Sequence, residues 1–434
     1  MSGRTPSRGR WSVLVVAAFT LAGTLTACSS SSDDVSSDSK QTIRFVWWGN
    51  EDRAAATKKV VAMFEKEHPN IKVQTEFSGY PAYVQKLTTQ IAGGAAPDLL
   101  QLDRPTFGEY QQKRQLADLT PYVGKSLKTE KIPASLLAGG KADGKQYAMP
   151  AGLTTELFVY DKDIFAKAGV SIPEDGWTWK QFAADMTKVH TKTGQAGASD
   201  FGWSADLFET WLHQQGKALY ASSTELGFTK DDLAKYWNML GSLRQKKGIT
   251  SAEVTTKSDG SVQNSPLIAK ESASETSYDS GVSSYVSSYQ GGELGLAPLP
   301  SDSTTASGMP ALPPVYYGVS KQSSHKEAAA LLLNFLVNDA EASKILGTTR
   351  GTPPNSDNKN AVCAQATGPD KQTCDFQTKV ADRLMPSDSW FWPSGSAALK
   401  SDFQRVYDDV IFGKTSVSAG AAKVVENAEQ GLDR

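Results

Sequence analysis

The sequence predicts an α/β fold, because apolar strands and one-sided helices alternate near its start. Residues 43–48 form an apolar run, 54–67 carry apolar residues at helical spacing, and 71–77 alternate apolar and polar residues. A helix that opens at Pro81 and an apolar strand over 98–102 continue the order. Strand, helix, strand, helix, strand is typical of a parallel sheet covered by helices.

Two capping motifs predict further helices. Thr178 and Gln181 have the S/T-x-x-E/Q spacing before a helical apolar stripe, and Ser324 and Glu327 repeat it before an apolar run that ends near Val337. The other predicted elements are a turn and strand over 139–150, a strand over 153–160, helices over 399–411 and 424–428, and loops over 301–314 and 347–369.

The first 27 residues have the form of an export signal. Three arginines precede an apolar run over 11–26, which is shorter than the roughly 20 residues of a membrane-spanning helix. The L-T-A-C pattern at 25–28 resembles the bacterial lipoprotein box, in which the cysteine is diacylated before cleavage. We therefore expect a signal peptide over 1–27, a lipid on Cys28 and a flexible Ser/Asp-rich tether over 28–40. An ordinary secretory signal with an accidental cysteine is the alternative.

Length and charge limit the classes of partner. The 434 residues suffice for two or three domains, and 45 basic residues stand against 47 acidic ones. No Lys/Arg run is present, so we expect no nucleic-acid partner. Cys363 and Cys374 remain as an even pair, and an oxidising compartment favours a disulfide between them. No histidine or further cysteine lies nearby, so a metal site is not expected.

Enzymatic signatures are absent. The chain lacks G-x-S-x-G, H-E-x-x-H and G-x-G-x-x-G, and the glycine-rich stretch 139–146 leads into a strand where a phosphate loop needs a helix. Glycoside hydrolysis stays open, because it requires only two carboxylates at a set separation in space. Asp103, Glu156, Asp161 and Glu209 are the conceivable acids.

Aromatic residues in polar surroundings give the stronger signal. Trp390 and Trp392 are flanked by loop residues, Tyr278 precedes Asp-Ser-Gly, and Trp211 stands in polar surroundings. Flat rings beside polar groups suit the C–H faces and hydroxyls of sugars. Other tryptophans are more consistent with a core role, namely Trp47, Trp177 and Trp237.

Polar residues follow each strand of the predicted first sheet. In open α/β sheets, ligands bind beyond the carboxyl ends of the strands. We therefore expect one binding edge, formed by Asn50, Glu51, Tyr80, Asp103 and Arg104.

With these residues in place, the chain resembles an extracellular solute-binding protein of a sugar ABC importer, in the maltose-binding-like group (family 1). The resemblance covers nearly all of 41–434. It rests on FVWWGNEDR at 45–53, QKLTTQIAGGAAPDLLQLD at 85–103, the segment 147–170, and GVSKQSSHKEAAALLLNFL at 318–336.

The resemblance implies a two-lobed, type II periplasmic-binding-protein-like fold, each lobe a sheet flanked by helices, with the ligand in the cleft between lobes. It places Trp48 on the cleft side of the first lobe, and Thr154 and Thr155 at the hinge. The implied lobes comprise 41–150 with 318–348, and 151–317 with 349–434.

Together these observations predict a lipid-anchored, extracellular substrate-binding component of an ABC importer, on the membrane of a Gram-positive cell. We expect a monomer that captures a mono- or oligosaccharide, delivers it to permease subunits, catalyses no reaction and needs no cofactor. The alternatives are a surface-anchored glycoside hydrolase and a receptor for a non-sugar solute.

Overall fold

The computed structural model describes residues 40–172, 176–303, 307–386, 392–393 and 395–432. Cys28 and Trp390, both singled out from the sequence, lie outside these residues. Two sheets organise the described chain, and each has its own apolar core. We call the parts built on the five-stranded and the three-stranded sheet the first and the second lobe.

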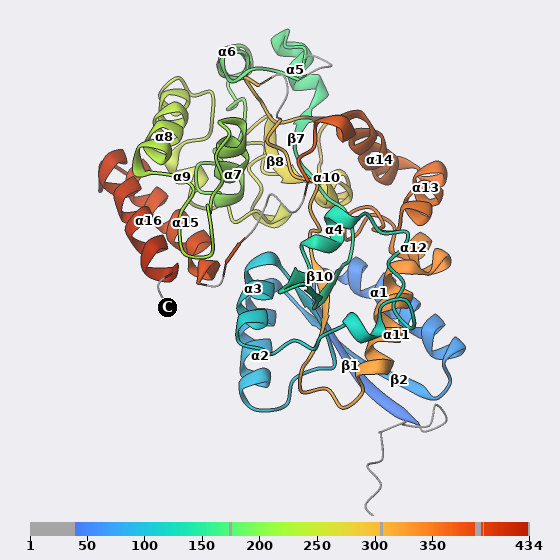
Figure 1. Ribbon diagram of the computed structural model, residues 1–434. Coiled ribbons are helices and arrows are strands. Elements are labelled where there is room, and N and C mark those ends of the chain that lie inside the picture. The colour runs from blue at the N-terminus through green and yellow to red at the C-terminus, as the bar shows by residue number, and fades with distance from the viewer. Residues whose placement is uncertain (1–39, 173–175, 304–306, 387–391, 394, 433–434) are drawn as a thin grey trace, which may run out of the picture. The chain divides into compact units, whose positions relative to one another are not determined.

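The first lobe contains a mixed sheet with the strand order β2-β1-β3-β10-β6. The predicted parallel strands are confirmed, since β1 pairs parallel to both β2 and β3. A strand from far along the chain, β10, then pairs antiparallel to β3 and β6. Figure 1 shows this orange strand beside the blue and green strands of the same sheet. The bounds are β1 (Gln41–Trp48), β2 (Ile71–Ser78), β3 (Leu99–Leu102), β6 (Ala148–Pro150) and β10 (Tyr316–Val319).

Helices cover both faces of this sheet, because side chains along β1 alternate between them. Ile43, Phe45 and Trp47 are fully buried in the core shared with α1 and α11. Val46 points into the opposite core, with α2 and α3. The elements of this lobe are α1 (Glu51–Glu67), α2 (Tyr80–Ala92), α3 (Arg104–Gln112), α4 (Ala134–Ala138), the hairpin β4 (Lys141–Ala142) and β5 (Lys145–Gln146), α11 (Lys326–Asn338) and α12 (Ala340–Leu346).

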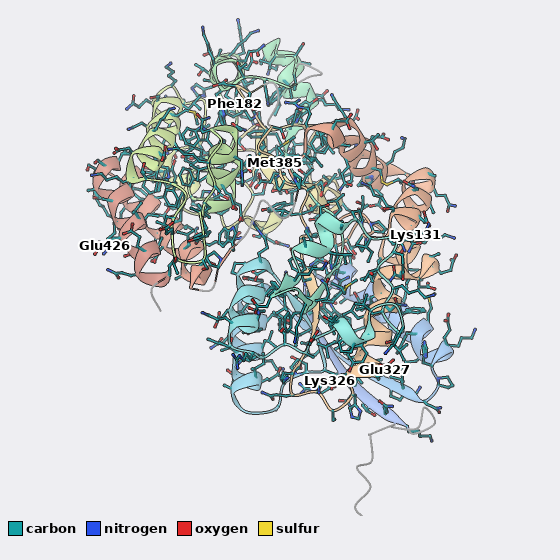
Figure 2. The ribbon with its side chains drawn as sticks, viewed as in Figure 1. Lys131, Phe182, Lys326, Glu327, Met385 and Glu426 are labelled. Atoms are coloured by element: carbon teal, nitrogen blue, oxygen red, sulfur yellow. A yellow bond between two sulfur atoms is a disulfide. The ribbon has the colours of Figure 1, made fainter. Side chains whose placement is uncertain are left out.

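The second lobe surrounds an antiparallel sheet with the order β8-β7-β9. Its core includes the fully buried Phe158 and Phe182, and Trp177 and Trp237 lie there as predicted. In Figure 2, Phe182 lies among interior side chains, whereas the exposed Glu426 lies at the margin. The strands are β7 (Glu156–Asp161), β8 (Ser274–Tyr278) and β9 (Leu294–Ala297).

Helices form most of the second lobe. They are α5 (Lys162–Ala168), α6 (Trp179–Thr193), α7 (Ala205–Gln214), α8 (Lys230–Gln245), α9 (Ala252–Thr255), α10 (Val282–Ser288), α14 (Gly368–Val380), α15 (Leu399–Ile411) and α16 (Val417–Leu432). A further helix, α13 (Ser356–Gln365), packs on α12 of the first lobe, where the Asn358 amide donates to the Ser343 hydroxyl at 2.9 Å. Over the described ranges, no helix combines the length and the apolar character that a bilayer crossing needs.

One of the two predicted capping boxes is confirmed and the other is wrong. Thr178 and Gln181 form reciprocal side-chain bonds at the start of α6. At α11 the N-cap is His325, which makes no capping side-chain bond. Instead, the Ser323 hydroxyl accepts from the His325 N–H at 3.0 Å and donates to Asp98 at 2.5 Å. The helix therefore begins one residue later than the motif requires.

The predicted loop over 347–369 is wrong in part, because it contains α13. Asn355 caps this helix, since its side-chain oxygen accepts from the backbone N–H groups of Asp357 and Asn358 at 3.0 and 3.3 Å. A disulfide joins Cys363 of α13 to Cys374 of α14, with Cα atoms 5.6 Å apart.

We predict that replacing both Cys363 and Cys374 with serine lowers the free energy of unfolding by about 3 kcal/mol, because a closed loop of this size restricts the unfolded chain. Urea unfolding with and without dithiothreitol measures the effect. The reductant should bring the wild type to the stability of the variant and leave the variant unchanged. A wild type that ignores the reductant would contradict the prediction.

Glu275 on β8 provides a second prediction, since burial raises the pKa of its carboxyl to about 7. The ordinary pKa of a glutamate is about 4.3. Between that value and pH 7, Glu275 keeps its proton in the folded chain but has released it in the unfolded chain. The free energy of unfolding therefore falls as pH rises through this window. Glu275→Gln retains an acceptor for Ser265 and should remove roughly 1 to 3 kcal/mol of that fall. Urea midpoints at pH 5 and pH 8 test this, with the exposed Glu67→Gln as the control. An unchanged difference between the two pH values would refute it.

Candidate functional site

Two cavities with common walls lie where the lobes face each other. Their volumes are about 430 Å³ and 210 Å³. Arg53 of α1 belongs to both, as do four residues of the second lobe. These four are Asp206, Tyr278, Ser280 and Lys400.

The smaller cavity gathers several residues that the sequence analysis singled out. Trp48 ends β1, and Asp103 and Arg104 follow β3, so the carboxyl ends of two parallel strands supply one wall. Thr154, on a segment that crosses between lobes, and Tyr278, at the end of β8, also line this cavity. The structure therefore brings these five side chains together.

Tyr80 lies beside this group without lining either cavity. Its hydroxyl donates to the Asp103 carboxylate at 2.5 Å, and its ring meets the Trp48 indole edge-on, with centroids 5.4 Å apart. The ring is 43% exposed. Tyr80 therefore orients Asp103 and Trp48 and remains accessible at the entrance.

Three other candidates lie elsewhere. Asn50 is the N-cap of α1, where its side chain accepts from the Arg53 N–H at 2.9 Å, and Glu51 is exposed in the first turn. Trp211 is buried in the second-lobe core, near-parallel to Phe208 with centroids 6.1 Å apart. Its position on α7 turns it toward the lobe interior, whereas Asp206 on the same helix faces the cavities.

Arg104 links the two lobes. Its guanidinium donates to Asp206 at 2.9 Å and to Glu209 at 3.3 Å, both on α7. Lys400 of α15 reaches the other Asp206 oxygen at 2.8 Å. Burial alone would lower the pKa of Arg104, but Glu209 and Asp206 hold this pKa above its ordinary value. The guanidinium therefore stays charged.

Trp392 completes this ionic group. Its indole N–H donates to Glu209 at 2.9 Å, and the Arg104 guanidinium lies 5.1 Å from its ring centre. The side chain is only 4% exposed and lines neither cavity. The backbone is close to the first lobe too, since a Cβ added at Gly108 of α3 would lie 3.0 Å from the Trp392 carbonyl oxygen. Trp392 thus packs behind the ion pairs.

Two buried acids in this region have raised pKa values. Burial raises the pKa of Glu156 to about 8, although the Thr210 hydroxyl donates to it. Burial also raises the pKa of Glu209 to about 7, against the opposing effect of Arg104. Glu156 lines the larger cavity, while Glu209 is engaged by Arg104 and Trp392.

The other two acids considered for glycoside hydrolysis have structural partners. Asp103 caps α3 through Thr106, and Asp161 caps α5 through the Ile164 N–H at 2.9 Å. Within the described residues, no three His, Cys, Asp or Glu side chains gather as a metal site would require.

The crossing segments meet at a hydrogen-bonded junction. Thr154 donates its hydroxyl proton to Asp279, and the Thr155 N–H donates to the same carboxylate at 3.2 Å. Gln377 of α14 donates to Asp279 at 2.7 Å and to the Leu153 carbonyl at 3.1 Å. Burial raises the pKa of Asp279 to about 6.

Several residues that line the cavities were not predicted from the sequence. Arg53 stands in the FVWWGNEDR segment and Ser280 in the YDSG segment, so both had a local signal. Asp206 and Lys400 had none, because they come from separate helices that only the fold brings together. Trp203 supplies an aromatic wall to the larger cavity.

Comparisons with solved structures show the two-lobed fold of solute-binding proteins. An extracellular solute-binding protein family 1 from Alicyclobacillus acidocaldarius is 30% identical with a TM-score of 0.69, over 91% of this chain and 98% of that chain. A periplasmic oligogalacturonide binding protein from Yersinia enterocolitica is 22% identical with a TM-score of 0.79, over 91% and 99%.

Sequence comparisons agree. The arabinooligosaccharide-binding protein of Bacillus subtilis is 24% identical over 217 residues, which is 49% of each chain. The chain spans about half the length of the curated relatives that it matches. Residues 48–343 match the family described as bacterial extracellular solute-binding protein. The chain therefore belongs to this family, whose members are binding proteins and not enzymes.

Proposed function

We propose that this chain is the substrate-binding component of an ABC importer and that its ligand is a mono- or oligosaccharide. The observation that carries the proposal is the pair of joined cavities, whose walls come from both lobes. Trp48, Trp203 and Tyr278 offer rings to the C–H faces of a sugar. Asp103, Asp206 and the hydroxyls beside them can bond to sugar hydroxyls. The names of the Bacillus and Yersinia relatives support this class of ligand.

Capture depends on closure of the lobes in this proposal. A ligand that contacts both lobes favours the closed arrangement, because it binds that arrangement more tightly. We propose lobes comprising 41–150 with 318–348, and 151–317 with 349–434, with Thr154 and Thr155 at the hinge. The bridges Leu153 to Thr352 and Thr154 to Leu312 pair the crossing segments and support this assignment.

We further propose that a lipid on Cys28 anchors the protein to the outer face of the membrane of a Gram-positive cell, where a monomer delivers its sugar to permease subunits. The arginine-rich start, the short apolar run and the L-T-A-C pattern support the anchor. The Ser/Asp-rich stretch that follows suits a solvated tether.

We predict that the purified protein binds a saccharide in calorimetry and that Trp48→Ala weakens this binding at least ten-fold, because the variant loses a large apolar face of the cavity. The exposed Phe412→Ala should bind like the wild type and serves as the control. Binding of a polyamine or peptide, with no response to any saccharide, would overturn the proposal.

For the anchor, we predict that Cys28→Ser moves the protein from the membrane fraction to the medium, since no acyl chain then holds it. Mass spectrometry of the wild-type N-terminus should show a diacylated Cys28. A mature protein that begins elsewhere and carries no lipid would exclude the anchor.

A further inference from the structure

Of the cations that line the cavities, Arg53 is the one that forms no ion pair with a described residue. Its guanidinium donates to the Thr349 carbonyl from Nε at 3.1 Å and from Nη2 at 2.6 Å, and to the Trp48 carbonyl from Nη1 at 3.3 Å. A guanidinium has five N–H groups, so two remain for a ligand. Gly49 allows the side chain to fold back, since a Cβ there would lie 2.5 Å from Arg53 Cδ.

A second buried arginine adds to this positive charge. Arg350 is 3% exposed and donates to the neutral groups of Gln101 at 3.0 Å and Thr57 at 2.9 Å. Its Nη1 has no hydrogen-bond partner among the described residues. Burial and the nearby Arg350 lower the pKa of Arg53 to about 9. In the described chain, no carboxylate forms an ion pair with either arginine.

The acids that line the cavities are already engaged. Asp206 pairs with Arg104 and Lys400, and Asp103 accepts from Tyr80 and Thr106. Neither of these carboxylates forms an ion pair with Arg53.

The other two acids that line the cavities, Asp259 and Glu156, also form no ion pair with Arg53. Asp259 accepts from the Ser261 N–H at 2.9 Å and from Asn264 at 2.8 Å. Glu156 holds its proton at pH 7, because burial raises its pKa to about 8. The counter-charge for Arg53 is therefore left to the ligand.

We propose that the cavities bind an acidic saccharide whose uronate carboxylate is received by the free N–H groups of Arg53. The planar guanidinium fork matches a carboxylate and gives a strong, directional bond. A single negative charge suits the site better than a phosphate dianion, since Asp103 and Asp206 line the same space. This inference rests on the proposed saccharide-binding function and makes it specific.

Calorimetry of the purified protein with matched pairs of saccharides tests the inference. The probes are galacturonate and galactose oligomers, and glucuronate and glucose oligomers, of equal length. In at least one of the two pairs, the acidic oligomer should bind at least ten-fold more tightly than its neutral partner. Arg53→Gln should weaken binding of this acidic oligomer at least thirty-fold and abolish the preference for the acidic over the neutral member. Lys59→Gln, an exposed cation on the same helix, should leave both unchanged.

Other results would contradict different parts of the proposal. Equal or tighter binding of the neutral member overturns the acidic ligand and leaves the proposed sugar-binding function intact. Tighter binding of a hexose phosphate than of the uronate overturns the assignment to a carboxylate. Failure of every saccharide to bind overturns the proposed function itself. If Arg53→Gln does not fold, the wild-type comparison of acidic and neutral partners decides alone.

Discussion

The arrangement of the cavities depends on the ion pairs that Arg104 makes across the lobes. Arg104 is the first residue of α3, and its guanidinium donates to two carboxylates on α7. Residues of both helices line the smaller cavity. Each buried charge loses hydration, and the opposite charges must compensate for that loss. Lys400 and the Trp392 indole satisfy further lone pairs of the same carboxylates. This fully bonded cluster sets the spacing between the walls at one end of the site.

A second cluster beside the site has a different chemistry. The junction of Asp279, Thr154 and Gln377 joins crossing segments through hydrogen bonds in which threonine and glutamine are the partners. These hydrogen bonds satisfy the buried Asp279 carboxylate without a second buried charge. The lobes are therefore joined beside the site in two ways, by the ion pairs of Arg104 and by the polar junction around Asp279.

Local sequence patterns predicted one side of the site well. Asp103 and Arg104 were predicted because parallel strands end at a common sheet edge, and Trp48 was predicted from the family resemblance. Trp47, Trp177 and Trp237 were assigned to cores that do contain them. The opposite wall was out of reach. Asp206 and Lys400 lie on helices nearly two hundred residues apart in sequence, so their contact is a property of the packed lobe.

Other elements were missed for reasons that are also physical. Trp211 shares a residue type with cavity aromatics, and only the rotation of α7 decides that it faces the core. The helix α13 has a polar sequence without a clear apolar stripe, so it resembles a loop until Asn355 and the disulfide are seen to hold it. The strand β10 is four residues long, which is too short for its alternation to be recognised.

The position of β10 also has a consequence for biosynthesis. This strand fills the gap between β3 and β6, so the sheet nearest the N-terminus stays incomplete until residue 319 has left the ribosome. Domains commonly fold in the order in which they are translated. Here the early strands must wait for a late segment, so the first-lobe sheet is completed only after all three strands of the second-lobe sheet have been translated.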